Sequence, residues 1–251
     1  MIASAPPPPA VSPAMRLLCT PWTRLKRAYL RRRLGRAVFE TVLGRRFAIW
    51  PGVFNPVVFR TGRFLAEFVG RSPVMETLGE AKTLLDVGTG CGVLAVTAAL
   101  RGYRVTAIDV VPEAVSCARA NALLNHVPVE VMSGDLFAPV EGRRFDVVLF
   151  SLPKFRGTPK STFEQSWRSP DVIDRLAAEL PAMLVPGGVA YFVLTSHGDC
   201  DGVLNGLAAS GMRVERLFWR HFGVETLAIY SARAAFGVAP VKRETSLAAS
   251  V

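Results

Sequence analysis

The chain has 251 residues, of which 50% are hydrophobic and 20% are charged, a composition typical of a folded protein rather than a disordered one. Its apolar runs are too short or too interrupted to cross a bilayer, so we expect no transmembrane segment. The net charge is +10, and residues 16–46 hold ten Lys or Arg but a single acid, so any electrostatic partner is expected there.

The N-terminal region divides into two predicted parts. Residues 1–14 are uncharged, rich in Pro and Ala and include the run Pro6–Pro9, which predicts an extended, disordered leader with Met15 as an alternative start. Residues 15–49 are predicted to be a basic helical segment, because hydrophobic residues recur at helical spacing between Trp22 and Leu43. The basic residues 16–46 favour a polyanionic partner only weakly, because a solvated basic face or contact with an anionic membrane surface explains them as well.

From Leu84 onward, short β-branched runs alternate with helical patterns, which predicts repeated βα units around a parallel sheet. A short connection around residues 221–223 predicts a hairpin between the last two strands, with an antiparallel strand at the sheet edge. Residues 240–251 are expected to be a flexible tail. Strands are expected at 83–87, 105–109, 128–132, 145–150, 188–195, 212–219 and 224–231, and helices at 92–101, 112–124 and 170–183.

A glycine-rich turn, Asp86–Gly92 (DVGTGCG), follows the first of these strands and opens a helix. Glycines at the carboxyl end of a parallel strand let a ligand approach the backbone, because no Cβ stands in the way. The spacing is DxGxGxG rather than the GxGxxG of dinucleotide-binding proteins, so an NAD-dependent oxidoreductase is disfavoured. A plain tight turn is the alternative.

Asp109 closes the second predicted strand, 17 residues after Gly92. A carboxylate at this place in a nucleotide-binding α/β fold can accept both ribose hydroxyls. The alternative is a cap for the helix that begins near Pro112. Neither the four cysteines nor the three histidines have the spacing of a metal site, so no metal is expected.

The acid followed by GxGxG resembles the first motif of the class I S-adenosylmethionine methyltransferases, and the resemblance extends over roughly residues 50–232. It implies a three-layer Rossmann-like α/β fold with a mostly parallel seven-stranded sheet and one antiparallel edge strand, within a domain at 50–239. It also implies S-adenosyl-L-methionine as cofactor, with Asp86 near its ammonium group and Asp135 near adenine. The implied cofactor residues are Asp86, Gly88, Thr89, Gly90, Gly92, Asp109, Val110, Gly134, Asp135, Leu136 and Ser151.

The run Ser151–Phe155 (SLPKF) resembles the [Asn/Asp/Ser]-Pro-Pro-[Tyr/Phe] motif of nitrogen-directed members, in the amine and small-domain group of that family. Ser151 and Pro153 match it, Phe155 supplies an aromatic ring, and the two other positions depart from it. The resemblance implies Ser151, Pro153 and Phe155 as catalytic residues. Upstream, residues 50–62 resemble the segment that covers the cofactor, with Phe54, Phe59 and Thr61 as candidate pocket residues or, for the aromatics, core residues.

The resemblance implies in-line transfer of a methyl group to a nucleophile on a protein, a nucleic acid or a small molecule, in an enzyme expected to be cytoplasmic. The positive cofactor is already reactive, so alignment matters more than acid–base chemistry. Lys154, Arg156 and Lys160 form a basic group after the fourth strand, either a solvated loop or a site for an acidic substrate. The altered SLPKF run keeps one alternative open, a catalytically silent module that binds S-adenosylmethionine or a nucleotide.

Overall fold

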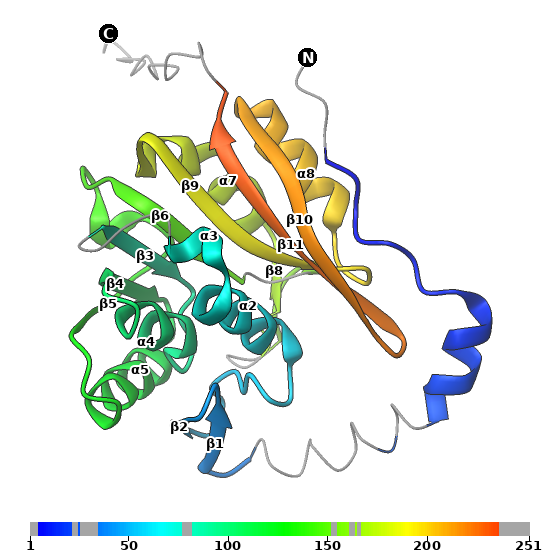
Figure 1. Ribbon diagram of the computed structural model, residues 1–251, viewed down its shortest axis with the longest axis horizontal. Helices are drawn as coiled ribbons and strands as arrows, with labels where there is room; N and C mark the ends of the chain where they lie inside the picture. Colours follow the sequence, from blue (N-terminus) through cyan, green and yellow to red (C-terminus); the bar gives the residue numbers. More distant parts are fainter. Residues whose placement is uncertain are drawn as a thin grey trace, which may run out of the picture.

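The computed structural model of the chain describes residues 5–21, 25, 35–76, 82–151, 155–160, 164 and 167–235. A twisted sheet lies between two groups of helices, which gives three layers (Figure 1). The seven strands run in the order β10-β11-β9-β6-β3-β4-β5. Their bounds are β3 Thr83–Val87, β4 Arg104–Asp109, β5 Val129–Ser133, β6 Phe145–Phe150, β9 Leu184–Thr195, β10 Met212–Phe222 and β11 Glu225–Ala234.

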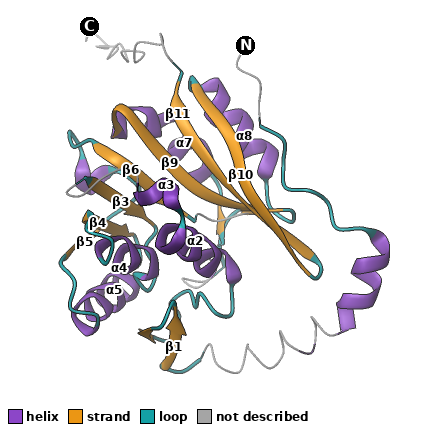
Figure 2. Cartoon of the chain, in the orientation of Figure 1, coloured by secondary structure: helices purple, strands orange, loops and turns teal. Residues whose placement is uncertain are grey.

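The main helices divide between the two faces of the sheet (Figure 2). Helices α2, α4 and α5 pack on one face around one hydrophobic cluster, and α7 and α8 pack on the other around a second cluster. Both faces are therefore buried, and the central strands are almost continuously apolar. The helix bounds are α2 Arg60–Arg71, α3 Pro73–Glu76, α4 Val93–Ala99, α5 Pro112–Leu124, the 3-10 turn η1 Ala138–Val140, α7 Val172–Met183 and α8 Cys200–Ala209.

The predicted fold class, a mostly parallel sheet of seven strands in a three-layer α/β arrangement, is confirmed. One detail differs: the antiparallel strand is β11, which lies between β10 and β9 rather than at the edge. The physical reason is burial. Strand β11 is apolar and buried along most of its length, whereas β10 alternates exposed residues such as Arg213 and Glu215 with buried ones and so suits the edge.

Helix α8 is an element that the sequence pattern did not predict. Its Gly202 and Gly206 lower the intrinsic helix propensity. The fold compensates locally, because the Asp199 carboxylate accepts a hydrogen bond from the N–H of Gly202 at 3.0 Å and caps the helix. A Cβ at Gly206 would lie 3.1 Å from that of Ala177, so the glycine lets α8 approach α7 closely.

The prediction of a helix up to Leu43 is wrong at its C-terminal end, from residue 35 onward, where the structure describes the chain. Val38–Val42 (β1) and Arg45–Ile49 (β2) form an antiparallel hairpin instead. Leu43 and Gly44 take positive φ angles of 52° and 76°, as a tight hairpin turn requires, and Asn121 of α5 bonds the backbone N–H and C=O of Ala48, each at 2.7 Å. Residues 13–21 are helical, whereas most of the predicted helix, at 22–24 and 26–34, lies outside the described residues.

The prediction of a disordered leader is also wrong where residues 5–12 are described, since Ala5 and Val11 are buried. The tail predicted at 240–251 lies outside the described residues. Within the described part of the chain, no helix combines the length and the apolar character needed to cross a membrane.

Gly92, at the start of α4, is expected to tolerate no side chain. Its φ is 80°, and a Cβ there would lie 3.1 Å from both Cα and Cβ of Ala118 on α5. Gly92→Ala should lower the free energy of unfolding by about 2–4 kcal/mol, from backbone strain and overpacking together. Gly142→Ala is the matched control, because Gly142 has a φ of 78° but open space around it, so it should cost only about 1 kcal/mol. Equal losses in urea unfolding would contradict the packing explanation.

Candidate active site

A cavity of about 370 Å³ opens at the carboxyl ends of β3, β4 and β5. This is where the strand order reverses, because the chain passes from β3 to β4 on one side and later returns to β6 on the other. Open α/β sheets bind ligands at such a switch point. The cavity is lined by Gly52–Phe54, Pro56, Gly62, Val87–Cys91, Val93, Leu94, Ile108–Val111, Ala114, Gly134–Leu136, Ser151, Pro159, Arg168–Pro170, Val172 and Arg175.

The glycine-rich turn forms the floor of this cavity. Gly88 and Gly90 take φ angles of 71° and 56°, a left-handed conformation that side chains disfavour. The N–H groups of Gly88 and Thr89 donate to the carbonyl of Ile108 on β4, at 2.9 and 3.0 Å. The turn is therefore fastened to the neighbouring strand and presents backbone to the cavity. Gly92 is not among the lining residues and instead lets α4 approach α5.

Asp109 ends β4 at the wall of the cavity and is only 9% exposed. Its Oδ2 accepts a hydrogen bond from the N–H of Gly90 at 2.8 Å, and its Oδ1 accepts one from the N–H of Val111 at 3.0 Å. Burial raises the pKa of this carboxyl, and the bonds from Val111 and Gly90 oppose that rise. Each oxygen keeps a free lone pair for a ligand hydroxyl. The alternative of a helix cap is not found, since the N-cap of α5 is Val111.

Asp86 lies under the turn and does not line the cavity. Its Oδ2 accepts hydrogen bonds from the Thr89 hydroxyl at 2.7 Å and from the N–H of Ala95 at 3.2 Å, so it joins the turn to α4. Its Oδ1 is buried with no hydrogen-bond partner among the described residues. Complete burial raises the pKa of Asp86 to about 7. Contact with a ligand ammonium group stays a prediction for this residue.

The turn after β5 supplies Gly134, Asp135 and Leu136 to the cavity wall. A Cβ at Gly134 would lie 2.2 Å from Cγ of Pro139, so this position requires glycine. The predicted residue Asp135 is paired with Arg175 of α7, at 2.6 and 3.1 Å between guanidinium nitrogens and carboxylate oxygens. Arg175 also lines the cavity and was missed, because no local motif marks an arginine in the middle of a helix.

Ser151 follows β6 and lines both the large cavity and a smaller one of about 30 Å³. Phe54 also borders both cavities, and its ring stacks on that of Phe59 with centroids 4.6 Å apart. Thr61 borders the smaller one. The sequence-predicted residues Ser151, Phe54 and Thr61 are thus brought together where the two cavities meet.

The other two predicted catalytic residues are not placed at this junction. Pro153 lies outside the described residues. Phe155 is 37% exposed, belongs to the two-residue strand β7 (Phe155–Arg156) and lines neither cavity. Strand β7 pairs with β8 (Arg168–Ser169), and the Arg168 guanidinium lies 5.9 Å from the centre of the Phe155 ring. A role for Phe155 in stacking on a substrate stays a prediction.

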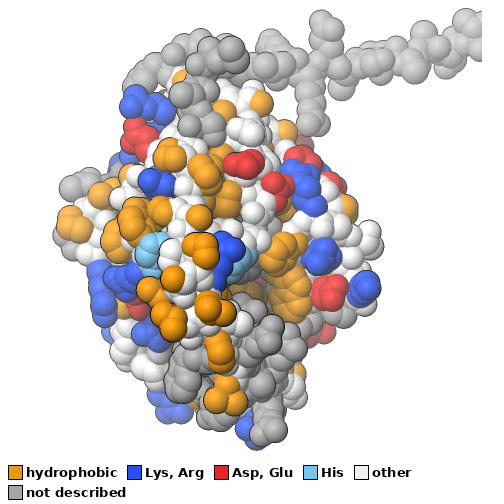
Figure 3. Space-filling model, turned by 90° about the vertical axis from the view of Figure 1, so that its right-hand side faces the viewer, with side chains coloured by type: hydrophobic (Ala, Val, Ile, Leu, Met, Phe, Trp, Pro, Cys, Tyr) orange, Lys and Arg blue, Asp and Glu red, His pale blue; other side chains and the backbone are white. Residues whose placement is uncertain are grey.

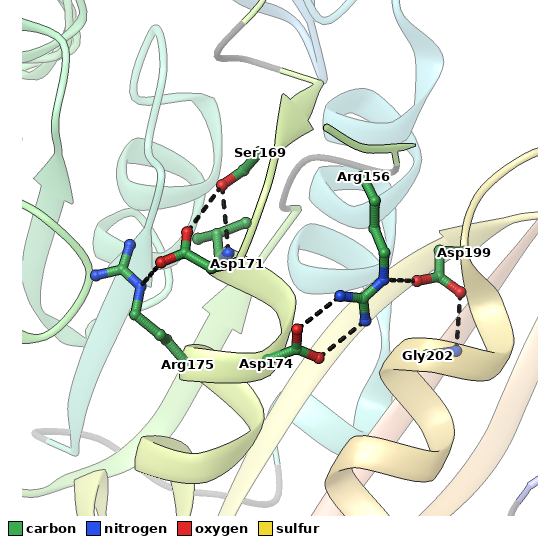
Figure 4. Close-up of polar contacts among 8 residues, drawn as sticks. Arg156, Ser169, Asp171, Asp174, Arg175, Asp199 and Gly202 are labelled. Carbon is green, nitrogen blue, oxygen red and sulfur yellow. Dashed lines mark hydrogen bonds and ion pairs between the residues drawn. The ribbon is translucent and has the colours of Figure 1, made fainter. Parts of the chain in front are cut away.

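Arg156 ties this segment to two helices (Figure 4). Its guanidinium donates two hydrogen bonds to Asp174 of α7, at 2.6 and 2.9 Å, and one to Asp199 at the start of α8. The two carboxylates raise the pKa of Arg156 further above its already high value. The positive charge is therefore already paired, which argues against the hypothesis that Arg156 binds an acidic substrate. Among the described residues, no cluster of His, Cys, Asp and Glu could hold a metal ion.

Comparison with known proteins agrees with this geometry. The model of the methyltransferase small domain family matches residues 51–215. The chain belongs to this family. It is 34% identical over 143 residues to the ribosomal RNA small subunit methyltransferase C of Alcanivorax borkumensis, a match that covers 56% of this chain and 41% of that protein. It is 37% identical over 129 residues to the release factor glutamine methyltransferase of Deinococcus radiodurans, covering 46% of each.

Among solved structures, the fold is similar to that of the 16S rRNA N2 G1207 methyltransferase of T. thermophilus, solved in complex with AdoMet and guanosine. The TM-score is 0.60 at 20% sequence identity, and the match covers 80% of this chain and 50% of that one. This small-domain family member spans less than half of the two curated relatives, so it corresponds to one part of them.

Proposed function

We propose that this small-domain protein is a methyltransferase that binds S-adenosyl-L-methionine in the cavity of about 370 Å³. One observation carries the proposal: the N–H of Gly90, in the left-handed glycine turn, donates a hydrogen bond to Oδ2 of the buried Asp109. This arrangement places exposed backbone and a carboxylate side by side, which suits a ligand with both a zwitterionic amino-acid part and a ribose. Family membership and the AdoMet complex of the T. thermophilus relative support the same ligand.

The cavity residues fit the parts of this cofactor. The backbone of Gly88–Gly90 would lie against its methionine part, and the Asp109 carboxylate would accept hydrogen bonds from its ribose hydroxyls. Leu136, which is buried, and Val111 offer apolar surface for the adenine ring. Asp135 can still accept a hydrogen bond from the adenine amino group, because pairing with Arg175 leaves lone pairs on both oxygens.

The bound cofactor supplies a methyl group made electrophilic by the positive sulfonium. The protein's own task is to align the acceptor with that methyl group and to keep water out. Ser151 lies where the two cavities meet and would hold the acceptor atom by a hydrogen bond. Phe54 forms an apolar wall at the same junction and excludes water from it.

We further propose that the acceptor is a planar nitrogen on a macromolecule. The T. thermophilus relative is named for the N2 atom of a guanine and the D. radiodurans relative for a glutamine, and both acceptors are planar amino or amide groups. Of the two macromolecules, RNA and protein, the ten Lys or Arg of residues 16–46 favour RNA as the acceptor, because phosphate contacts carry much of the affinity in nucleic-acid binding.

A transfer assay with labelled cofactor tests this proposal. The protein is incubated with S-adenosylmethionine labelled in the methyl group and with separated RNA, protein and metabolite fractions of a cell extract. Label in RNA that is lost at high salt supports the RNA acceptor, and label in protein identifies the alternative macromolecule. Calorimetric binding of the cofactor without label in any fraction would instead favour the catalytically silent module.

Ser151→Ala is expected to lower kcat/KM for the acceptor about tenfold, the loss of one hydrogen bond that is made in the transition state. Cofactor affinity should change less than threefold, because Asp109 and the glycine turn are untouched. Ser133→Ala is the matched control, since Ser133 also ends a strand but is exposed and lines neither cavity. Equal activity of the Ser151 variant and the wild type would remove Ser151 from the mechanism.

A further inference from the structure

The N-terminal residues 5–11 lie on the sheet face that carries α8, beside β10 and β11 (Figure 1). Ala5 is 7% exposed and belongs to the hydrophobic cluster around α7 and α8, and Val11 is 5% exposed. Pro8 between them is buried as well, whereas Pro6 and Pro7 are exposed. Burial therefore recurs at every third residue.

A period of three residues identifies the conformation. The polyproline II helix has three residues per turn, so it presents one residue in three to a surface. Its backbone makes no internal hydrogen bonds, and proline has no N–H, so its carbonyl groups need donors from outside. Recognition of such a helix therefore combines apolar contacts at every third residue with side-chain donors aimed at the carbonyls.

Two such side-chain donors, Tyr230 and Arg216, are present in this protein. The hydroxyl of Tyr230 on β11 donates to the carbonyl of Pro6 at 2.9 Å, and Arg216 on β10 donates to the carbonyl of Pro7 at 2.6 Å. Tyr230 is completely buried, and its ring is fixed by stacking on Phe192, with centroids 5.4 Å apart. Burial raises the pKa of this hydroxyl, which keeps it protonated and able to donate.

Arg216 lies on the same face of β10 as Met212 and Val214, which belong to the cluster around α7 and α8, because side chains alternate along a strand. The pairing of β10 with β11 shifts register between Arg216 and Phe218, as at a β-bulge. Bulges turn side chains away from the regular alternation. The strand beyond it leaves Leu217, Phe218 and Trp219 between 40% and 44% exposed. Figure 3 shows that hydrophobic side chains reach the surface on the side of the molecule that lies to the right in Figure 1.

We propose that the surface formed by α8, β10 and β11 is a binding site for a polyproline II helix, and that its occupant is residues 5–11 of the same chain. Ser12 and Pro13 then end the extended segment, because residues 13–21 are helical and the Ser12 hydroxyl accepts a hydrogen bond from the N–H of Met15 at 3.3 Å. The bound segment fixes where the basic residues 16–46 begin. This inference does not depend on the proposed methyl transfer.

Hydrogen exchange in the full-length chain tests the two donors. Tyr230→Phe and Arg216→Met each remove one donor with little change of volume, so the amides of Ala5 and Val11, the two buried non-proline residues of the segment, should exchange about fivefold faster, which corresponds to the loss of one hydrogen bond. Arg213→Met is the matched control: Arg213 lies on the same strand and pairs with Glu215 at 2.8 Å, and its substitution should leave these amides unchanged. Unchanged exchange in all three variants would overturn the proposal.

A peptide in trans tests the occupant. Ala5→Asp combined with Val11→Asp should expel the chain's own segment, and a labelled peptide of residues 3–13 (ASAPPPPAVSP) should then bind, as fluorescence anisotropy would show. Binding to the wild type should be at least tenfold weaker, and adding Tyr230→Phe should weaken binding to the double variant about fivefold. A folded double variant that does not bind the peptide would refute the site. A dimeric wild type whose dimer is lost in the double variant would assign the segment to a second copy and overturn the same-chain occupant.

Calorimetry with S-adenosylmethionine keeps the two proposals separate. Ala5, Arg216 and Tyr230 line neither cavity, so these variants should bind the cofactor with unchanged affinity. A wild-type protein that does not bind the cofactor would count against the proposed function alone. Failure of the exchange and peptide experiments would count against the polyproline site alone.

Discussion

Asp109→Asn is expected to weaken binding of S-adenosylmethionine at least 100-fold. The carboxylate would accept two ribose hydroxyls in a site where it is only 9% exposed, and hydrogen bonds to a buried charged group contribute about 1.5–3 kcal/mol each. Isothermal titration calorimetry measures the loss directly. Glu113→Gln is the control, because Glu113 is an exposed acid in the first turn of α5 that lies outside the cavity, and it should leave the affinity unchanged.

The asparagine also disturbs the turn. Gly90 and Val111 donate to different oxygens of Asp109, and the substitution replaces one of these oxygens by an NH₂ group that cannot accept a hydrogen bond. A cofactor analogue without the two ribose hydroxyls separates the two effects. If the carboxylate binds the ribose, the substitution should weaken the analogue far less than the natural cofactor. An equal loss for both ligands would mean that Asp109 acts only by shaping the turn.

The buried Asp86 should make stability depend on pH. Its pKa is about 7 in the folded chain against 3.8 in the unfolded chain, so the folded state favours the protonated form. The stabilising contribution is complete below about pH 4 and is lost as the pH rises through 7, because the unfolded chain ionises first. The loss relative to Asp86→Asn should reach up to about 4 kcal/mol, since one pKa unit corresponds to about 1.36 kcal/mol.

Asp86→Asn is a suitable reference because both hydrogen bonds, from Thr89 and Ala95, converge on Oδ2 and can be accepted by the amide oxygen. Urea unfolding of both proteins at several pH values between 4 and 8, without ligand, gives the difference. A difference that stays constant over this range would show that Asp86 titrates normally. The proposed cationic cofactor should reduce the wild-type loss, because it favours the ionised carboxylate.

The repeated βα units were predictable because hydrophobic spacing is local information. Strands β3 and β6 and helix α5 lie at the expected residues, and the turn Asp86–Gly92 and Asp109 stand side by side as expected. These features depend on rules that act within a few residues: buried strands are apolar, tight turns need glycine, and parallel strands end at one edge.

Other features depend on contacts between distant residues, and the sequence pattern alone misassigned or missed them. The hairpin β1–β2 is held by Asn121, more than 70 residues away, so its apolar spacing was mistaken for a helix. Arg156 and Arg175 found carboxylate partners on other elements, which no local motif reveals. The segment of residues 5–11 has a disordered composition, yet Tyr230 and Arg216 hold it.

The sequence by itself thus determined the fold class, the family resemblance and the place of the glycine turn, because these follow from local periodicity and from the conformational freedom of glycine. Only the tertiary structure decided that Asp86 supports the turn from below while Asp109 faces the cavity, that Ser151 joins two cavities, and that a proline-rich segment belongs to the folded domain. The reason is physical: burial and pairing arise between residues far apart in the chain, and they decide which side chains remain available to a ligand.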